Sequence, residues 1–175
     1  MVEIVYGVAA SLDGFIASPD GKLDWLAPFA AAGSDHFAEF MNSVDAVLVG
    51  SRTYEEMLPM GGGKSFGKPC YVFSSRKIVS DGPTVTITNS SPEEVVADLE
   101  RSGVRRAWHF GGTKLFTSFR DAGLITEYSL GIIPVILGGG KPLFESPGAA
   151  AKLSLLEAKP HPSGALMVRY RVVAG

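Results

Sequence analysis

Short apolar runs alternate with amphipathic stretches from residue 4 to residue 133, and this alternation limits the fold more than any other feature. Strands that alternate with helices need right-handed crossovers, so they form a mostly parallel sheet with helices on both faces. The sequence therefore predicts a three-layer α/β fold. The expected strands are Ile4–Ala10, Ala46–Val49, Pro69–Phe73, Thr84–Thr88, Ala107–Phe110 and Tyr128–Ile133.

Helices are expected between these strands. The clearest start is Ser91-Pro92-Glu93-Glu94, which combines a cap serine, a proline at the first helical position and a glutamate three residues after the cap. We expect Val95, Val96 and Leu99 of this helix to face the core. The other expected helices carry Phe37, Phe40 and Met41 behind a cap at Ser34 or Asp35, the stretch Tyr54–Leu58, and Leu115, Phe116 and Phe119.

The C-terminal part has a different pattern. Lys152–Lys159 and Ala165–Val172 are joined through Pro160–Gly164, as in a pair of strands with a turn between them. We therefore expect an antiparallel hairpin added to the edge of the parallel sheet.

Composition limits the class of protein. With 175 residues, 46% hydrophobic and 19% charged, the chain predicts one globular domain over residues 1–175. A formal net charge of -2 argues against nucleic acid or an anionic bilayer as the partner. The single cysteine, Cys70, and three scattered histidines argue against a disulfide or a metal site. Without a membrane span or the features of a signal peptide, we expect a cytoplasmic protein.

Three of the expected strands end in small or basic residues, at Gly50–Thr53, Ser74–Lys77 and Gly111–Lys114. Backbone N–H groups at a helix start, glycines and nearby Arg or Lys side chains can together bind phosphate. One such turn alone is more often ordinary turn chemistry. Three on one parallel sheet, where ligands bind beyond the carboxyl ends of the strands, indicate an extended polyphosphate ligand such as a dinucleotide.

Other catalytic motifs are incomplete in this sequence. Gly61-Gly62-Gly63-Lys64-Ser65 ends like a P-loop, but Leu58 stands where the first glycine is required and no strand precedes it. In Gly138-Gly139-Gly140-Lys141, Pro142 replaces the Ser or Thr that would hold magnesium. The chain has no nucleophile elbow, and Cys70 lies in an apolar strand. Asp35 remains, either as an acid at a helix start that faces the fold or as a helix cap.

Five motifs follow one another along the chain. They are Ala10-Ser11-Leu12-Asp13-Gly14-Phe15-Ile16-Ala17, Gly50-Ser51-Arg52-Thr53-Tyr54-Glu55, Ser74-Ser75-Arg76, His109-Phe110-Gly111-Gly112-Thr113 and Pro134-Val135-Ile136-Leu137-Gly138-Gly139-Gly140. In this order, the chain resembles the dihydrofolate reductase-like superfamily, and specifically stand-alone proteins similar to the reductase domain of riboflavin biosynthesis. The resemblance covers nearly the whole chain and implies a dihydrofolate reductase-like fold.

The resemblance implies NADPH as the cofactor. It places Ala9, Ile16 and Ala17 near the nicotinamide. Trp25 resembles the loop tryptophan of dihydrofolate reductases, and Asp35 falls at the place of their acid when one residue of spacing is allowed. The residues implied near the cofactor phosphates are Gly50, Ser51, Arg52, Thr53, Ser74, Ser75, Arg76, Phe110, Gly111, Gly112, Thr113 and Lys114.

The implied activity is hydride delivery to a C=N or masked imine of a phosphoribosylaminopyrimidine or a pteridine-like ring. A dihydrofolate or pterin reductase and an NADPH-binding protein without turnover are the alternatives, and relatives suggest a homodimer. The chain departs from the family pattern in two places. Ser51 stands where an arginine is usual, with Arg52 one residue later, and no Asp-Asp-Pro substrate segment follows the second strand. The zinc deaminase signature fused to many relatives is also absent from this sequence.

Overall fold

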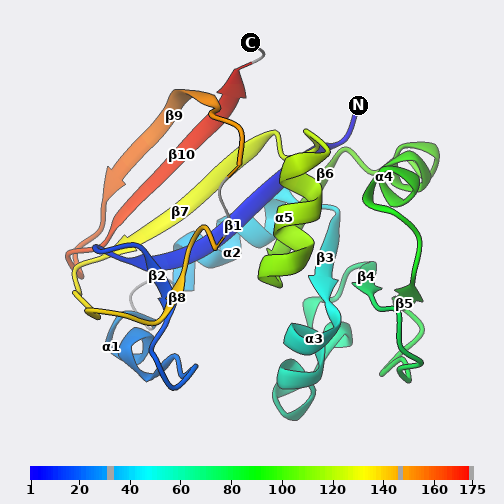
Figure 1. Ribbon diagram of the computed structural model, residues 1–175, viewed down its shortest axis with the longest axis horizontal. Helices are drawn as coiled ribbons and strands as arrows, with labels where there is room; N and C mark the ends of the chain where they lie inside the picture. Colours follow the sequence, from blue (N-terminus) through cyan, green and yellow to red (C-terminus); the bar gives the residue numbers. More distant parts are fainter. Residues whose placement is uncertain (31–33, 146–147, 174–175) are drawn as a thin grey trace. The chain divides into compact units, whose positions relative to one another are not determined.

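The computed structural model describes residues 1–30, 34–145 and 148–173, without the side chains of Ala30, Ser34 and Asp35. The strand order is β5-β4-β3-β6-β1-β7-β10-β9, and β2 and β8 form a separate pair (Figure 1). Contacts divide the chain into two compact units, Met1–Tyr6 with Ser43–Thr126 and Gly7–Asn42 with Glu127–Gly175. We call them unit 1 and unit 2 and describe each by itself. A single domain over residues 1–175 stays a prediction.

Unit 1 is built on parallel strands. Its members are the first part of β1 (Glu3–Ser11), β3 (Ala46–Gly50), β4 (Cys70–Phe73), β5 (Val85–Thr88) and β6 (Arg106–Gly111). Every neighbouring pair, β5–β4, β4–β3, β3–β6 and β6–β1, is parallel. Residues 46–49 of β3 are completely buried, as expected for a central strand covered on both faces. The predicted mostly parallel sheet is confirmed.

The helices of unit 1 are α3 (Ser51–Met57), α4 (Pro92–Arg101) and α5 (Thr113–Asp121), with the short 3₁₀ segments η2 (Leu58–Met60) and η3 (Gly63–Phe66). The capping box of α4 is confirmed: the Ser91 hydroxyl accepts from the Glu94 backbone N–H, and the Glu94 carboxylate accepts from that of Ser91. Val95 and Leu99 are buried, but Val96 is only half-buried because it lies at the margin of the apolar face.

Unit 2 contains the antiparallel part of the fold. The predicted hairpin is confirmed as β9 (Lys152–Pro160) and β10 (Leu166–Val173), and β10 also pairs antiparallel with β7 (Glu127–Ile133). The unit also holds the second part of β1, the strand pair β2 (Phe15–Ala17) and β8 (Lys141–Pro142), the 3₁₀ segment η1 (Asp24–Leu26), and the helices α1 (Ala27–Ala30) and α2 (Ser34–Ser43).

Two expectations about helix starts were wrong. We expected a separate turn before a helix at Tyr54–Leu58, but α3 begins at Ser51, directly after Gly50. Gly50 has extended backbone angles and lets the chain enter the helix without intervening residues. Similarly, α2 begins at Ser34, so Asp35 lies in the first turn and is not the cap, and the preceding position is outside the described residues. No helix in the described part of the chain is long and apolar enough to cross a membrane.

Candidate functional site

Three strand ends of unit 1 lie side by side, as the sequence predicted. In the parallel register, Gly50 of β3 is opposite Phe73 of β4, and Val49 of β3 is opposite Gly111 of β6. The segments that follow these strands therefore begin at one carboxyl edge, in the spatial order β4, β3, β6. A ligand that contacts all three segments would lie along this edge, where parallel sheets usually bind nucleotides.

Two of the segments touch through glycines. A Cβ atom on Gly112 would lie 3.2 Å from the Gly50 Cα and 3.3 Å from the Gly50 backbone nitrogen. A Cβ atom on Gly50 would lie 3.4 Å from the Gly112 Cα. Gly112 also has φ +98°, a backbone conformation that residues with a side chain rarely adopt. The backbones before α3 and α5 are close because neither position carries a side chain.

Small and basic side chains surround this glycine contact. The Thr53 side chain is next to Gly111, because a Cβ atom on Gly111 would lie 3.6 Å from the Thr53 methyl group. Arg52 and Lys114 are exposed, and neither forms an ion pair with a side chain in the described ranges. Ser51 is half-buried, whereas Thr113 is buried. Two cations are thus available near the start of α3 and α5 for an anionic ligand.

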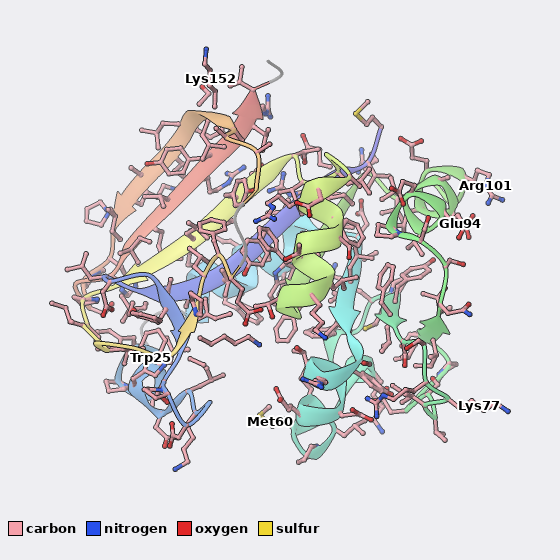
Figure 2. All side chains as sticks on the ribbon, in the orientation of Figure 1. Trp25, Met60, Lys77, Glu94, Arg101 and Lys152 are labelled. Atoms are coloured by element: carbon pink, nitrogen blue, oxygen red, sulfur yellow. The ribbon has the colours of Figure 1, made fainter. Side chains whose placement is uncertain are left out.

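The segment after β4 is already engaged with its own unit. The Ser74 hydroxyl donates to the Arg76 carbonyl at 2.9 Å and accepts from the Arg76 backbone N–H at 3.0 Å. The Arg76 side chain donates from Nη2 to the Glu55 carboxylate at 2.7 Å. Ser75 and Lys77 are exposed, and Figure 2 shows the Lys77 side chain pointing away from the ribbon. The predicted phosphate-binding arginine is therefore held by α3.

Aromatic side chains alternate across β6. Phe110 and Trp108 contact each other edge to face and both contact Phe66 of η3. His109 points to the other face, where its ring lies 5.6 Å from Tyr6 and 5.3 Å from Phe119. Burial lowers the pKa of His109 to about 4, against the smaller opposing effect of nearby backbone groups. His109 is thus a neutral core residue that lies two positions before Gly111.

The residues implied near the nicotinamide all belong to unit 2. Ala9 lies in β1, whereas Ile16 and Ala17 lie in β2. Ala17 is buried, and the other two are half-buried. A Cβ atom on Gly140 would lie only 2.1 Å from the Ala17 carbonyl oxygen, so the loop before β8 packs directly on β2. Whether these residues contact a cofactor stays a prediction.

The two residues expected to act on the substrate also belong to unit 2. Trp25 lies in η1, below the β2–β8 pair in Figure 2, and is half-buried. Its indole N–H is buried without a hydrogen-bond partner among the described residues, so it is a donor that a ligand could use. Asp35 is the second residue of α2, and its side chain lies outside the described part.

Sequence reasoning missed Glu55, Asp13 and the ring environment of His109. Glu55 and Asp13 act through partners far along the chain, Arg76 for Glu55 and the backbone of Leu137 and Gly138 for Asp13. The motifs contain both acidic residues, but spacing alone does not show which partner each meets. No group of three or more His, Cys, Asp and Glu side chains suited to a metal ion occurs among the residues with described placement.

The family profile of the RibD C-terminal domain matches residues 2–167. This chain belongs to the RibD C-terminal domain family. Two Bacillus subtilis (strain 168) proteins of the curated set are similar over most of their length. The uncharacterised protein YwjB is 34% identical over 154 residues, which is 87% of this chain and 88% of YwjB. The uncharacterised protein YyaP is 30% identical over 180 residues, which is 96% of this chain and 94% of YyaP.

Solved structures of other proteins share the fold. A candidate riboflavin biosynthesis protein from Shewanella sp. PV-4 has a TM-score of 0.84 at 26% identity, covering 99% of this chain and 100% of that chain. A diaminohydroxyphosphoribosylaminopyrimidine deaminase/5-amino-6-(5-phosphoribosylamino)uracil reductase from Thermotoga maritima has a TM-score of 0.71 at 20% identity, covering 98% of this chain and 57% of that chain. The dihydrofolate reductase-like fold implied by the sequence motifs is thereby confirmed.

Proposed function

We propose that this protein is an NADPH-dependent reductase of the 5-amino-6-(5-phosphoribosylamino)uracil reductase type. The observation that carries the proposal is the arrangement of three strand ends on one sheet edge, with the Gly50–Gly112 contact between two of them. Membership of the RibD C-terminal domain family supports the same activity. The Thermotoga maritima protein of the same fold carries that reductase activity in its name.

The residues of unit 1 fit the phosphates of a dinucleotide. Gly112 directly precedes α5, whose first backbone N–H groups can bind an anion, and the Thr53 hydroxyl lies close to Gly111. Arg52 and Lys114 supply positive charge without a competing ion pair in the described chain. Backbone donors together with these cations can bind a pyrophosphate group.

Arg76 is the residue that we expect to select NADPH over NADH. Its guanidinium group can bind a 2′-phosphate with two parallel hydrogen bonds, and Ser75 is an exposed hydroxyl next to it. Glu55 engages only Nη2 of Arg76 among the described contacts. The remaining N–H groups of the guanidinium are therefore available to a phosphate.

For the chemical step, bound NADPH would supply a hydride to the carbon of a C=N bond while a proton reaches the nitrogen. We assign delivery or support of that proton to the carboxyl group of Asp35, and a hydrogen bond to the substrate ring to the Trp25 indole N–H. The substrate is a phosphoribosylaminopyrimidine in this proposal. A dihydrofolate or pterin reductase remains the second candidate, and an NADPH-binding protein without turnover the third.

The deciding experiment is steady-state NADPH oxidation with a panel of substrates. The proposal expects turnover with the phosphoribosylaminopyrimidine and little with dihydrofolate. The reverse preference would establish a pterin reductase. NADPH binding without oxidation across the panel would favour the third candidate, and failure to bind NADPH would refute all three.

We also propose that the protein forms a homodimer through β9. This edge strand exposes three leucines, at 45% for Leu153, 55% for Leu155 and 40% for Leu156. Exposed apolar side chains on an edge strand favour pairing with another chain. A second copy can present the same strand by two-fold symmetry. Light scattering should show a dimer for the wild type and a monomer for Leu155→Lys, whereas Leu23→Lys, at an exposed leucine outside β9, should leave the dimer intact. A monomeric wild type would refute this part of the proposal.

The remaining expectations about partners concern what the protein does not bind. The nearly neutral formal charge of -2 provides no general attraction to nucleic acid or anionic lipid. We therefore propose a small-molecule substrate and an action in the cytoplasm.

A further inference from the structure

Asp13 connects two loops of unit 2 that lie far apart in the sequence. Its Oδ1 accepts from the Leu137 backbone N–H at 3.1 Å, and its Oδ2 accepts from the Gly138 backbone N–H at 2.8 Å. Oδ1 also accepts from the Ser11 hydroxyl at 2.6 Å, and that hydroxyl accepts from the Phe15 backbone N–H at 2.9 Å. One carboxylate thus joins the end of β1, the start of β2 and the loop before β8.

Further contacts attach the same two segments to each other. The Leu12 backbone N–H donates to the Val135 carbonyl at 2.9 Å, and the Leu143 backbone N–H donates to the Gly14 carbonyl at 2.8 Å. In the short pair β2–β8, which Figure 1 shows side by side, Ala17 is opposite Lys141. Asp13 therefore binds the segment that leads into β8, the strand that pairs with β2.

A second aspartate shows that this arrangement is not an ordinary serine–aspartate turn. Asp20 also follows a serine by two residues, is also exposed, and accepts from the Ser18 hydroxyl. Its other partners are the Lys22 backbone N–H and ammonium group, two residues away. Hydrogen bonds from serine lower the pKa of both carboxyl groups. Asp13 differs from Asp20 because it binds backbone groups more than 120 residues away.

We propose that Asp13 is a positioning residue, whose carboxylate holds the loop at Leu137–Gly138 on β2 and thereby fixes Ile16 and Ala17 for the nicotinamide end of the cofactor. This inference rests on the proposed binding of NADPH. At Leu137 and Gly138 themselves, the hydrogen bonds seen among the described residues that reach another segment are the two to Asp13. Releasing the loop should therefore disturb β2.

The test separates the two ends of the cofactor by binding two ligands. Calorimetry would measure the Kd of NADPH and of adenosine 2′,5′-bisphosphate, which lacks the nicotinamide end. Asp13→Asn places an amide NH₂ group against a backbone N–H that needs an acceptor, so we expect the Kd of NADPH to rise about tenfold. The Kd of the bisphosphate should stay within about twofold, because Asp13 does not bear on the adenosine end. Asp20→Asn is the matched control and should change neither value.

A second variant tests the same loop without altering the carboxylate. Gly138→Ala strains the backbone at Gly138, which has a positive φ and whose N–H donates to the Asp13 carboxylate. We expect this variant to bind NADPH more weakly and the bisphosphate as the wild type does. Gly21→Ala is its control, because Gly21 has φ +79° and equally open surroundings. Hydrogen exchange at Leu137 and Gly138 should accelerate in Asp13→Asn, which reports on the loop without any ligand.

The outcomes distinguish this inference from the proposed function. If the wild type binds both ligands and Asp13→Asn weakens both equally or neither, the positioning role is refuted while NADPH binding stands. A wild type that binds neither ligand refutes the proposed function and this inference with it. Unchanged exchange at Leu137 and Gly138 would show that Asp13 does not hold the loop.

Discussion

The guanidinium group of Arg76 forms an ion pair with the carboxylate of Glu55, with 2.7 Å between Nη2 and Oε2. Both side chains are substantially exposed, at 58% and 40%, so the pair contributes only ~0–1 kcal/mol. A charge-assisted hydrogen bond to a phosphate contributes ~1.5–3 kcal/mol. A 2′-phosphate would therefore displace the Glu55 carboxylate from Arg76 or share the guanidinium group with it. Glu55 orients the Arg76 side chain in the free protein and would not block the phosphate.

Removal of Arg76 should reduce the preference for NADPH. Arg76→Ala should weaken NADPH binding about tenfold to a hundredfold and leave NADH binding nearly unchanged, because only NADPH carries the 2′-phosphate. Glu55→Gln should strengthen NADPH binding by less than about fivefold, since it removes a weak competitor. Calorimetric titration of both cofactors measures these values.

Arg101→Ala is the control for the Arg76 experiment, because Arg101 is an exposed arginine paired with Asp98 on α4. It should change neither cofactor's Kd. An equal loss of NADPH and NADH binding in Arg76→Ala would assign Arg76 to the fold or the pyrophosphate. A wild-type preference for NADH would contradict the proposed cofactor.

Gly112 should be important for stability as well as for cofactor binding. Gly112→Ala adds a Cβ atom 3.2 Å from the Gly50 Cα at a backbone conformation with φ +98°, and we expect it to reduce the free energy of unfolding by ~2–4 kcal/mol. Gly103→Ala is matched for positive φ, at +78°, but has no neighbour within 4 Å. It should cost only ~1–2 kcal/mol.

Denaturant unfolding of both variants separates the strain of a positive φ, which both share, from the contact with Gly50, which only Gly112→Ala makes. The difference between them measures the close approach of Gly50 and Gly112. Equal losses in the two variants would show that this approach is unimportant. Gly112→Val adds more bulk at the same place and should also weaken NADPH binding if the turn receives the pyrophosphate. A folded Gly112→Val protein with native affinity would leave the turn with a structural role alone.

Asp35→Asn tests the proposed acid. The amide keeps the size of the side chain and removes its ionisable group, so turnover should fall ~10–1000-fold while NADPH binding changes little. Glu39→Gln removes an exposed carboxylate from the same helix, α2, and should leave turnover unchanged. Unchanged turnover in Asp35→Asn, together with a lower melting temperature, would instead indicate that Asp35 only stabilises the start of α2.

The sequence was sufficient for features whose cause is local. The buried strands of unit 1 follow from apolar runs such as Ala46–Val49, and the start of α4 follows from the reciprocal bonds of Ser91 and Glu94. The hairpin at the C-terminus follows from two strand patterns around a turn. In each case, neighbouring residues supply both the pattern and the interaction that it predicts.

Features that depend on distant partners could not be predicted in this way. The strands β2 and β8 have only three and two residues, too few for a period, and their segments are joined by hydrogen bonds from Leu137 and Gly138 to Asp13, more than 120 residues away. The Gly50–Gly112 contact combines two turns that each look ordinary. Motifs indicated the carboxyl edge of the sheet, whereas the ion pair of Arg76 required the fold to be known.

His109 should make the stability of the protein depend on pH. Burial lowers its pKa to about 4 from the ordinary value of 6.5, so between these values the unfolded chain binds a proton that the folded protein does not. The contribution is complete above pH 6.5 and is lost as the pH falls toward 4. Its full size is about 3 kcal/mol, from 1.36 kcal/mol for each unit of pKa.

His109→Phe keeps a ring that can pack against Tyr6, Phe116 and Phe119 without a titrating group. Denaturant unfolding at pH 7.0 and 4.5 should therefore show that the free energy of unfolding falls less for His109→Phe than for the wild type. The carboxylates that titrate in this range are common to both proteins and do not affect the difference. The same loss in both would mean that His109 is protonated inside the fold, or that the fold opens around it, and would contradict its assignment as a neutral core residue.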